Sequence, residues 1–166
     1  MKLLLTLIVV VISAVIIGFF VLSYLTKNNQ PLGLVDTKLA ACIQKPNCVC
    51  SEYPEDTSHF IQPIDLSEAG VRANLSSVEI ISTIKEVITD AGGRLQENQG
   101  LHSDSLYLAA TFHSSLFGFI DDVETRYDPK NNLLHFRSAS RAGYSDLGVN
   151  RKRVMQLSDA IVRRLQ

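Results

Sequence analysis

Charged side chains that could bind an anionic ligand gather between residues 117 and 153. The candidates are acidic and basic residues in similar number: Asp121, Asp122, Glu124, Asp146, Arg137, Arg141, Arg151 and Arg153. Glycines and other small residues separate charges of both signs, which indicates charges held in a defined geometry. Arginine can form two parallel hydrogen bonds with a phosphate or a carboxylate. The segment therefore predicts either a binding site for an anion or a network of ion pairs.

Both interpretations, an anion site and an ion-pair network, apply to the start of the last expected helix, near Asn150. Arg151, Lys152 and Arg153 occupy its first turn, where the helix dipole disfavours positive charge. Free amide groups at a helix N-terminus attract anions, so these cations could clamp a phosphate, a carboxylate or a lipid headgroup. In the alternative, the acidic residues neutralise the arginines, because structural ion pairs imitate functional sites. We expect ion pairs for most of the network.

Signals for catalysis, metal binding and nucleic-acid binding are weak. The four histidines are scattered, and the segment 112–115 lacks the Gly-x-Ser-x-Gly pattern of a serine hydrolase. The spacing of the three cysteines with His59 matches no common zinc pattern. The 16 basic residues nearly balance the 17 acidic ones, and the basic run contains no interleaved aromatic residues. We expect no catalytic residue, no metal, no cofactor and no nucleic-acid partner.

All three cysteines fall within the segment 42–50. Pro46 and Asn47 favour a turn that brings Cys42 close to Cys48, so a disulfide between these two is the preferred pairing. Cys50 is then left as the one reactive thiol. A lipoprotein cleavage box at residues 39–42 is the weaker alternative, because some 14 polar or mixed residues separate it from the apolar N-terminus. A disulfide favours an oxidising compartment outside the cytosol.

The N-terminus predicts a membrane anchor over residues 1–26. Residues 3–25 carry no charge and would span roughly 34 Å as a helix, enough to cross a hydrocarbon core of about 30 Å. No small-residue cleavage site follows, so we expect an uncleaved single-pass anchor in the inner membrane that contacts the lipid bilayer. Lysines flank the segment on both sides, so the positive-inside rule barely distinguishes the two possible orientations in the membrane. The cysteines favour a periplasmic domain.

The rest of the chain predicts a linker over residues 27–38 and an α+β domain over 39–166. An irregular, cysteine-containing arm covers about 39–70. An apolar stripe of Val78, Ile81, Ile84, Val87 and Ile88 predicts a helix that starts at Ser77 and ends before Gly92. Strands are expected over 94–97, 105–112, 119–127 and 133–138, and a second helix near Asn150 carries the stripe Val154, Leu157, Ile161 and Leu165. The predicted fold is a four-stranded antiparallel sheet packed with two helices.

Strand alternation assigns the charged residues to faces of this sheet. If Leu134 and Phe136 face the helices, Arg137 faces away from them. Asp122, Glu124 and Arg126 share that outer face with Tyr107, which predicts a polar sheet surface with acids and bases in cross-strand reach. Asp121 falls on the core side and needs a partner there, for which Arg141 or a cluster of backbone amides is the candidate.

The motifs that carry the chemistry also carry a family resemblance. Residues 42–49, 117–124 and 137–153 resemble the domain of unknown function 1499 family, from about Leu39 to the C-terminus. The resemblance implies an N-terminal membrane segment or export signal, and no established activity comes with it. Cys50 stands where the family pattern usually has serine, which leaves the pairing partner of Cys42 open.

These observations together predict a membrane-anchored envelope protein. Its expected role is a non-catalytic binding or scaffolding module for an anionic ligand or lipid headgroup. The alternatives are a protein-interaction subunit of an envelope complex, with an envelope protein as partner, and an enzyme of unknown class.

Overall fold

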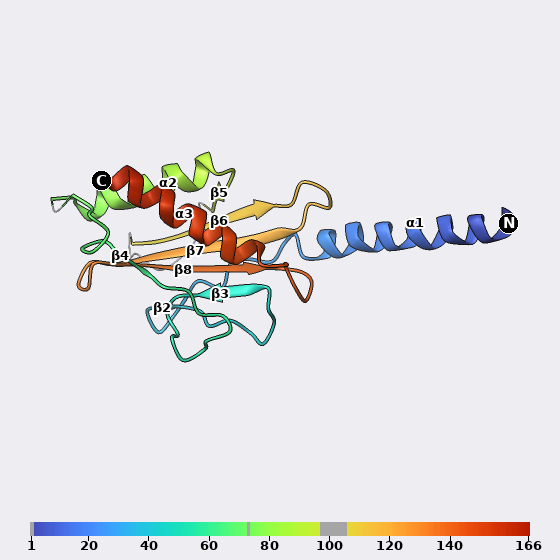
Figure 1. Cartoon of the computed structure of the whole chain (residues 1–166), viewed down its shortest axis with the longest axis horizontal. Helices are drawn as coiled ribbons and strands as arrows, with labels where there is room; N and C mark the ends of the chain where they lie inside the picture. The colour runs from blue at the N-terminus through green and yellow to red at the C-terminus, as the bar shows by residue number, and fades with distance from the viewer. Residues whose placement is uncertain (1, 73, 97–105) are drawn as a thin grey trace.

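The computed structural model describes residues 2–72, 74–96 and 106–166, and a long N-terminal helix projects from one end of a mixed domain (Figure 1). This helix, α1, runs over Lys2–Leu25 and has no charged residue after Lys2. By length and composition it can cross a membrane, and a signal sequence has the same properties. None of the residues in its most apolar 18-residue window is buried by the rest of the described chain.

The domain is built on one antiparallel sheet of six strands in the order β3-β8-β7-β6-β5, with β4 also paired to β8. The strands are β3 (Cys48–Cys50), β4 (Ile64–Asp65), β5 (Arg94–Leu95), β6 (Tyr107–His113), β7 (Ile120–Asp128) and β8 (Leu133–Ser140). The α+β class is confirmed, but the prediction of four strands is wrong. The arm supplies β3 and β4, which are too short to show the alternation that identifies a strand in a sequence.

The turn between β7 and β8 follows the expected hairpin chemistry. A carboxylate oxygen of Asp128 accepts hydrogen bonds from the amides of Lys130 and Asn131, at 3.1 and 3.4 Å. Asn132 takes a left-handed backbone with φ 54°, which asparagine tolerates better than most residues. The turn therefore aligns β7 and β8 so that Glu124 lies opposite Arg137.

Helices α2 (Ser77–Asp90) and α3 (Val149–Leu165) cover one face of the sheet (Figure 1). Ser76 caps α2 in a reciprocal pair with Glu79, as its sequence predicts. The buried residues of α2 are Ile80, Ile81, Ile84, Val87 and Ile88. Val78, expected in this stripe, is 77% exposed. At 3.6 residues per turn it lies about 120° around the helix from Ile84, away from the core.

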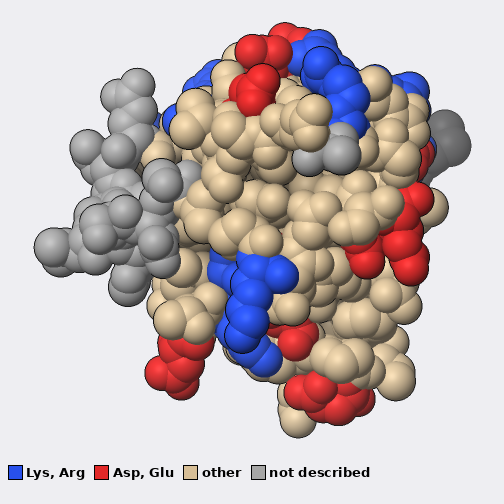
Figure 2. Space-filling view, turned by 90° about the vertical axis from the view of Figure 1, so that its left-hand side faces the viewer, with Lys and Arg blue, Asp and Glu red and all other residues tan. Residues whose placement is uncertain are grey.

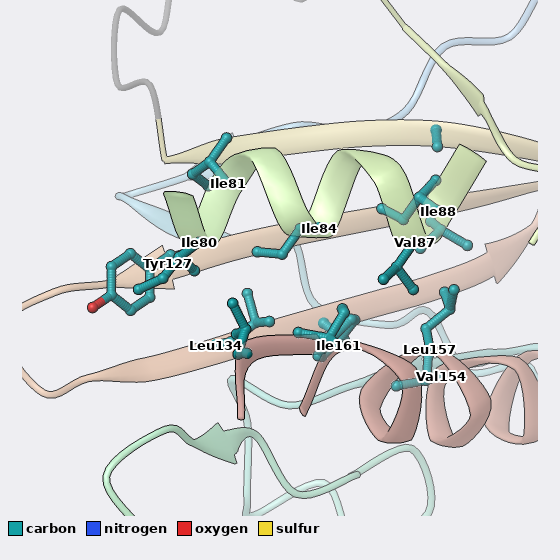
Figure 3. Close-up of a cluster of buried hydrophobic side chains, with 14 of the residues drawn as sticks. Ile80, Ile81, Ile84, Val87, Ile88, Tyr127, Leu134, Val154, Leu157 and Ile161 are labelled. Atoms are coloured by element: carbon teal, nitrogen blue, oxygen red, sulfur yellow. The ribbon is translucent and has the colours of Figure 1, made fainter. Parts of the chain in front are cut away.

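Between the helices and the sheet lies the main hydrophobic core (Figure 3). Ile84 and Ile88 of α2 point toward Leu157 and Ile161 of α3 and toward the strands, and Leu134 and Phe136 of β8 are fully buried. The chain leaves α2 through Gly93, where an added Cβ would lie 2.6 Å from a side-chain carbon of Ile88. Glycine is required there so that β5 can start directly beneath the helix.

The opposite face of the sheet is covered by the N-terminal part of the chain. Strands β1 (Leu34–Val35) and β2 (Lys38–Leu39) form a small hairpin, and β2 packs against β7 and β8. The segment 27–38, predicted to be a linker, therefore contributes structure to the domain. The expected polar sheet surface is not open to solvent, because β2 and the arm cover it.

Candidate functional site

Glu124 lies at the centre of the covered sheet face and is fully buried. Its carboxylate accepts hydrogen bonds from Arg137 Nη1 at 2.7 Å, from the Tyr107 hydroxyl at 2.7 Å and from the Gly33 amide at 2.8 Å. Burial, followed by the charge of Glu124, raises the pKa of the Tyr107 hydroxyl, which stays protonated and donates. Three donors compensate the buried carboxylate, which would otherwise be costly.

Asp122 forms the second pair on this face, with Arg141. The guanidinium group bonds both carboxylate oxygens, with Nη2 to Oδ1 at 2.7 Å, and its Nη1 donates to the Lys27 carbonyl at 3.0 Å. Burial raises the pKa of Asp122, and the hydrogen bond from Arg141 opposes that shift. The expected pairing of Arg141 with Asp121 is wrong. Asp122 lies opposite Ala139, and Arg141, two residues further on, shares the face of Ala139.

Asp121 lies on the helix side of the sheet, as strand alternation predicts, and its partner comes from α3. Arg153 Nη2 donates to Asp121 Oδ2 at 2.8 Å. The same guanidinium group donates to Asn150 Oδ1 at 2.7 Å and stacks 4.8 Å from the centre of the Phe112 ring. Arg153 is thereby committed to holding α3 on the sheet.

A third charged cluster, absent from the sequence prediction, joins the arm to the sheet. Glu52 of the arm is buried and accepts from Arg126 Nε at 2.7 Å, while His135 Nδ1 lies 3.6 Å from its other oxygen. Burial lowers the pKa of His135, and the charge of Glu52 opposes this shift. Strand alternation predicts that Arg126 and His135 lie on this face of the sheet. No sequence pattern assigns Glu52 to this face, because it lies in an irregular segment.

Asp146 shapes the start of α3 and forms no ion pair with an arginine side chain of the described residues. Its carboxylate accepts the amides of Gly148 at 3.0 Å and Asn150 at 2.7 Å. Arg151 donates instead to the backbone carbonyls of Phe60 and Ser58, at 2.8 and 3.2 Å. The expectation that Asp146 neutralises these arginines is wrong, because its oxygens satisfy the free amides of the helix start.

The disulfide between Cys42 and Cys48 is present, as the spacing predicts. Cys50 is free but buried, and burial raises its pKa to about 11. A thiol with this pKa is almost entirely protonated near neutral pH and reacts slowly. Cys50 therefore does not fit the expectation of a reactive thiol in the native protein.

A pocket of about 590 Å³ lies between the disulfide loop, the turn before β4 and the start of α3. Its lining includes Lys45, Asp56, His59, Tyr144 and Arg151. His59 joins two of its walls, because Nδ1 lies 2.7 Å from Asp56 Oδ2 and Nε2 lies 3.0 Å from the carbonyl oxygen of Lys45.

The charges in this pocket are not equally available to a ligand. The Ser58 hydroxyl donates to Asp56 Oδ1 at 2.8 Å, and this bond, followed by the one from His59, lowers the pKa of Asp56. The oxygens of Asp146 are taken by helix amides. Within the described chain, the Lys45 ammonium group has no recorded hydrogen bond. The pocket thus contains Lys45 together with Arg151, whose guanidinium group donates to backbone carbonyls and to no carboxylate in the described structure, while both acidic residues already accept hydrogen bonds.

Comparison with known protein families identifies the family of this domain. A family model described as a protein of unknown function (DUF1499) matches residues 38–161, which is most of the chain. The chain belongs to the DUF1499 family. The match starts at β2 and covers all six strands of the main sheet, so the DUF1499 domain includes the ion pairs and the pocket, while α1 lies outside it. No curated protein and no solved structure matches the chain.

A second hollow of the DUF1499 domain, about 560 Å³, lies between α2 and α3. Its floor is apolar, with Val87, Phe112 and Leu157, and basic side chains including Lys152 and Arg164 lie at its margin. Arg164 is paired there with Glu86 and Asp90 in exposed ion pairs. Asp121, a candidate site residue, lines neither this hollow nor the pocket beside the disulfide.

Charge on the outside of the DUF1499 domain is dispersed at the end opposite α1. Figure 2 shows basic and acidic side chains there in small separate groups among uncharged atoms. A nucleic-acid-binding surface has a continuous basic stripe, and this face has none. Among the described residues, no group of three or more histidine, cysteine or carboxylate side chains is arranged to hold a metal ion.

Proposed function

We propose that this protein is a membrane-anchored, non-catalytic domain that binds an anionic group in the pocket beside the disulfide. The ligand is a phosphate or carboxylate group, carried by a lipid headgroup or by a small solute. Helix α1 serves as an uncleaved single-pass anchor in the inner membrane, and the domain lies on the periplasmic side. The disulfide supports this side, because such bonds persist in oxidising compartments.

The observation that carries the proposal is that Lys45 and Arg151 line one pocket whose two carboxylates, Asp56 and Asp146, already accept hydrogen bonds from within the chain. Gly148, the N-cap of α3, also lines this pocket, but the Asp146 carboxylate already accepts the amides of this helix start, so the site rests on the two cations. Arg137, Arg141 and Arg153 drop out of the candidate ligand set, because each is bonded to a carboxylate.

The alternatives have less support. A protein-interaction subunit would use the polar outer face of the sheet, and β2 and the arm cover that face. An enzyme would gain support from a deep pocket containing Asp121, whereas Asp121 is bonded to Arg153 and lines neither of the two main hollows.

The proposal is tested by calorimetric titration of the full-length protein with inorganic phosphate and with vesicles. The vesicles contain either phosphatidylcholine alone or phosphatidylcholine with anionic phosphatidylglycerol. Lys45→Gln should weaken binding roughly 10- to 100-fold, because a hydrogen bond to a charged group contributes about 1.5–3 kcal/mol. Lys152→Gln is the matched control, since it removes one charge from a residue outside the pocket.

The two probes separate the two ligand sources. Phosphate binding that depends on Lys45 indicates a small anion, and binding only to anionic vesicles indicates a lipid headgroup. Equal losses in Lys45→Gln and Lys152→Gln would show nonspecific attraction and overturn the site. Binding to neither probe would overturn the function.

A further inference from the structure

The connection between β6 and β7, residues 114–119, folds back against α1. The ring centre of Phe117 lies 5.0 Å from that of Phe19 and 5.5 Å from that of Phe20, and Phe119 lies 6.2 Å from Phe19. Ser23, beside this connection, is the one buried residue of α1. A part of the globular domain thus packs on the helix within the segment expected to cross the membrane.

The depth of this contact follows from helix geometry. The apolar segment 3–25 is centred near Ala14, and half of a hydrocarbon core of about 30 Å corresponds to about ten residues at 1.5 Å each. The boundary then falls near Tyr24. Phe19 and Phe20 lie about 6–8 Å inside it, and the contacting ring of Phe117 lies at a similar depth.

The connection is suited to an apolar environment. Leu116 at its tip is 71% exposed, and Phe117 and Phe119 flank Gly118 beside it. Its backbone forms a closed turn: the Ser114 amide donates to the Phe119 carbonyl at 2.8 Å, and the Gly118 amide to the Ser114 carbonyl at 3.1 Å. The Phe119 amide is satisfied by the Ser114 hydroxyl at 2.9 Å. Internal hydrogen bonds lower the cost of placing a backbone in lipid.

We propose that residues 114–119 form a second membrane-contacting element, a hairpin tip that inserts Leu116 and Phe117 into the leaflet next to the domain. This inference rests on the proposed role of α1 as a retained anchor. The loop 141–148 lies at the same end of the domain (Figure 1), and its Leu147 is 94% exposed. Arg141 bonds the turn that follows α1 through the Lys27 carbonyl. Because α1 and the hairpin tip enter the bilayer side by side, together they fix the orientation of the domain on the membrane.

The absence of tryptophan from the chain gives a direct test. Three full-length variants, Leu116→Trp, Phe19→Trp and Val78→Trp, each carry a single tryptophan and are reconstituted in phosphatidylcholine vesicles with or without bromine on the acyl chains. Phe19→Trp reports the anchor. Val78 is 77% exposed at the start of α2, at the end of the domain away from α1, and serves as the aqueous control (Figure 1).

The expected result is that brominated lipid quenches most of the emission of Leu116→Trp and Phe19→Trp and leaves Val78→Trp unchanged. Quenching of Phe19→Trp alone would overturn the hairpin insertion and leave the anchor intact. Emission from Leu116→Trp that is blue-shifted but unquenched would show that protein, a second copy or a partner, covers the tip, and would equally overturn it. Loss of quenching in both would overturn the anchor itself.

Discussion

Carboxylates on β7 alternate between the two faces of the sheet, and each meets an arginine on its own side. Asp121 points toward α3 and bonds Arg153, whereas Asp122 and Glu124 point toward the arm side and bond Arg141 and Arg137. Burying two charges costs about as much as their attraction returns, so such pairs stabilise little in net terms. We expect their main effect to be on strand register, because a strand shifted by one residue would leave every one of these charges unpaired.

Glu124→Gln should lower the free energy of unfolding by about 3–5 kcal/mol. The substitution leaves the Arg137 guanidinium buried without a counter-charge, and Arg137 Nε already lacks a hydrogen-bond partner. Chemical denaturation of the full-length protein in detergent measures the change.

The matched control is Glu86→Gln, which removes the same charge from an exposed pair with Arg164. Exposed pairs contribute about 0–1 kcal/mol, so this variant should unfold close to wild type. Similar losses in the two variants would contradict the special role of the buried pair.

Helix α3 is attached to the sheet through one fully buried side chain at its start, Asn150. Its amide nitrogen donates to the Asn47 carbonyl at 3.0 Å and to the Ser140 hydroxyl at 3.1 Å, and its oxygen accepts from Ser138 and Arg153. The contacts join α3 to β8 and to the residue before β3. The same connection positions Arg151 at the pocket.

Asn150→Ala should destabilise the domain by about 2–3 kcal/mol, because it leaves buried donors and acceptors unpaired on β8 and on the residue before β3. Gln156→Ala, an exposed change in the same helix, is the control and should shift stability by less than about 0.5 kcal/mol. Equal thermal shifts for the two variants would show that α3 is held by its apolar stripe alone.

Long, periodic elements of this fold could be predicted from the sequence, as could the short strand β5, whereas the short strands β3 and β4 of the arm could not. The alternation of β6, β7 and β8 and the stripes of α2 and α3 come from the buried faces of these elements. Strands β3 and β4 have two or three residues each, so the sequence contains no period to detect.

The candidate site was predictable as a set of residues but not as a set of pairs. Strand alternation gave the face of Asp121, Asp122 and Glu124 correctly. It could not give the partner of Asp121 or the contact of Glu52 with Arg126, because both depend on how α3 and the arm pack. The pocket was missed for the same reason, since its walls come from three segments that are distant in sequence.

At the scale of the molecule, the sheet is enclosed by α2 and α3 on one side and by the N-terminal segments on the other (Figure 1). The Gly33 amide and Glu52 bring polar groups of these segments onto buried charges of the sheet. The N-terminal segments are therefore held on the sheet by specific polar contacts as well as by hydrophobic ones. The stability of this packing depends on the charge states of the contacting groups.

Acidification from about pH 7 to about pH 5.5 should lower the free energy of unfolding through His135. Burial lowers the pKa of His135 in the folded domain, so the unfolded chain, with an ordinary histidine pKa of about 6.5, binds more protons in this range. Stability then rises with pH, by at most about 1.4 kcal/mol per pH unit for one histidine. The groups around the ring are Glu52, Arg126 and Asp128, and the histidine charge would form beside Arg126.

Denaturation midpoints measured across this range for wild type and His135→Gln check the prediction, and the variant should show a flatter slope. His113 also has a pKa lowered by burial, but it is exposed and should contribute less, so His113→Gln is the control. The raised pKa of buried Asp122 works in the opposite direction: there the folded state binds the extra proton, which opposes the loss of stability only at lower pH. A slope unchanged by His135→Gln would show that the contact between arm and sheet does not depend on this proton.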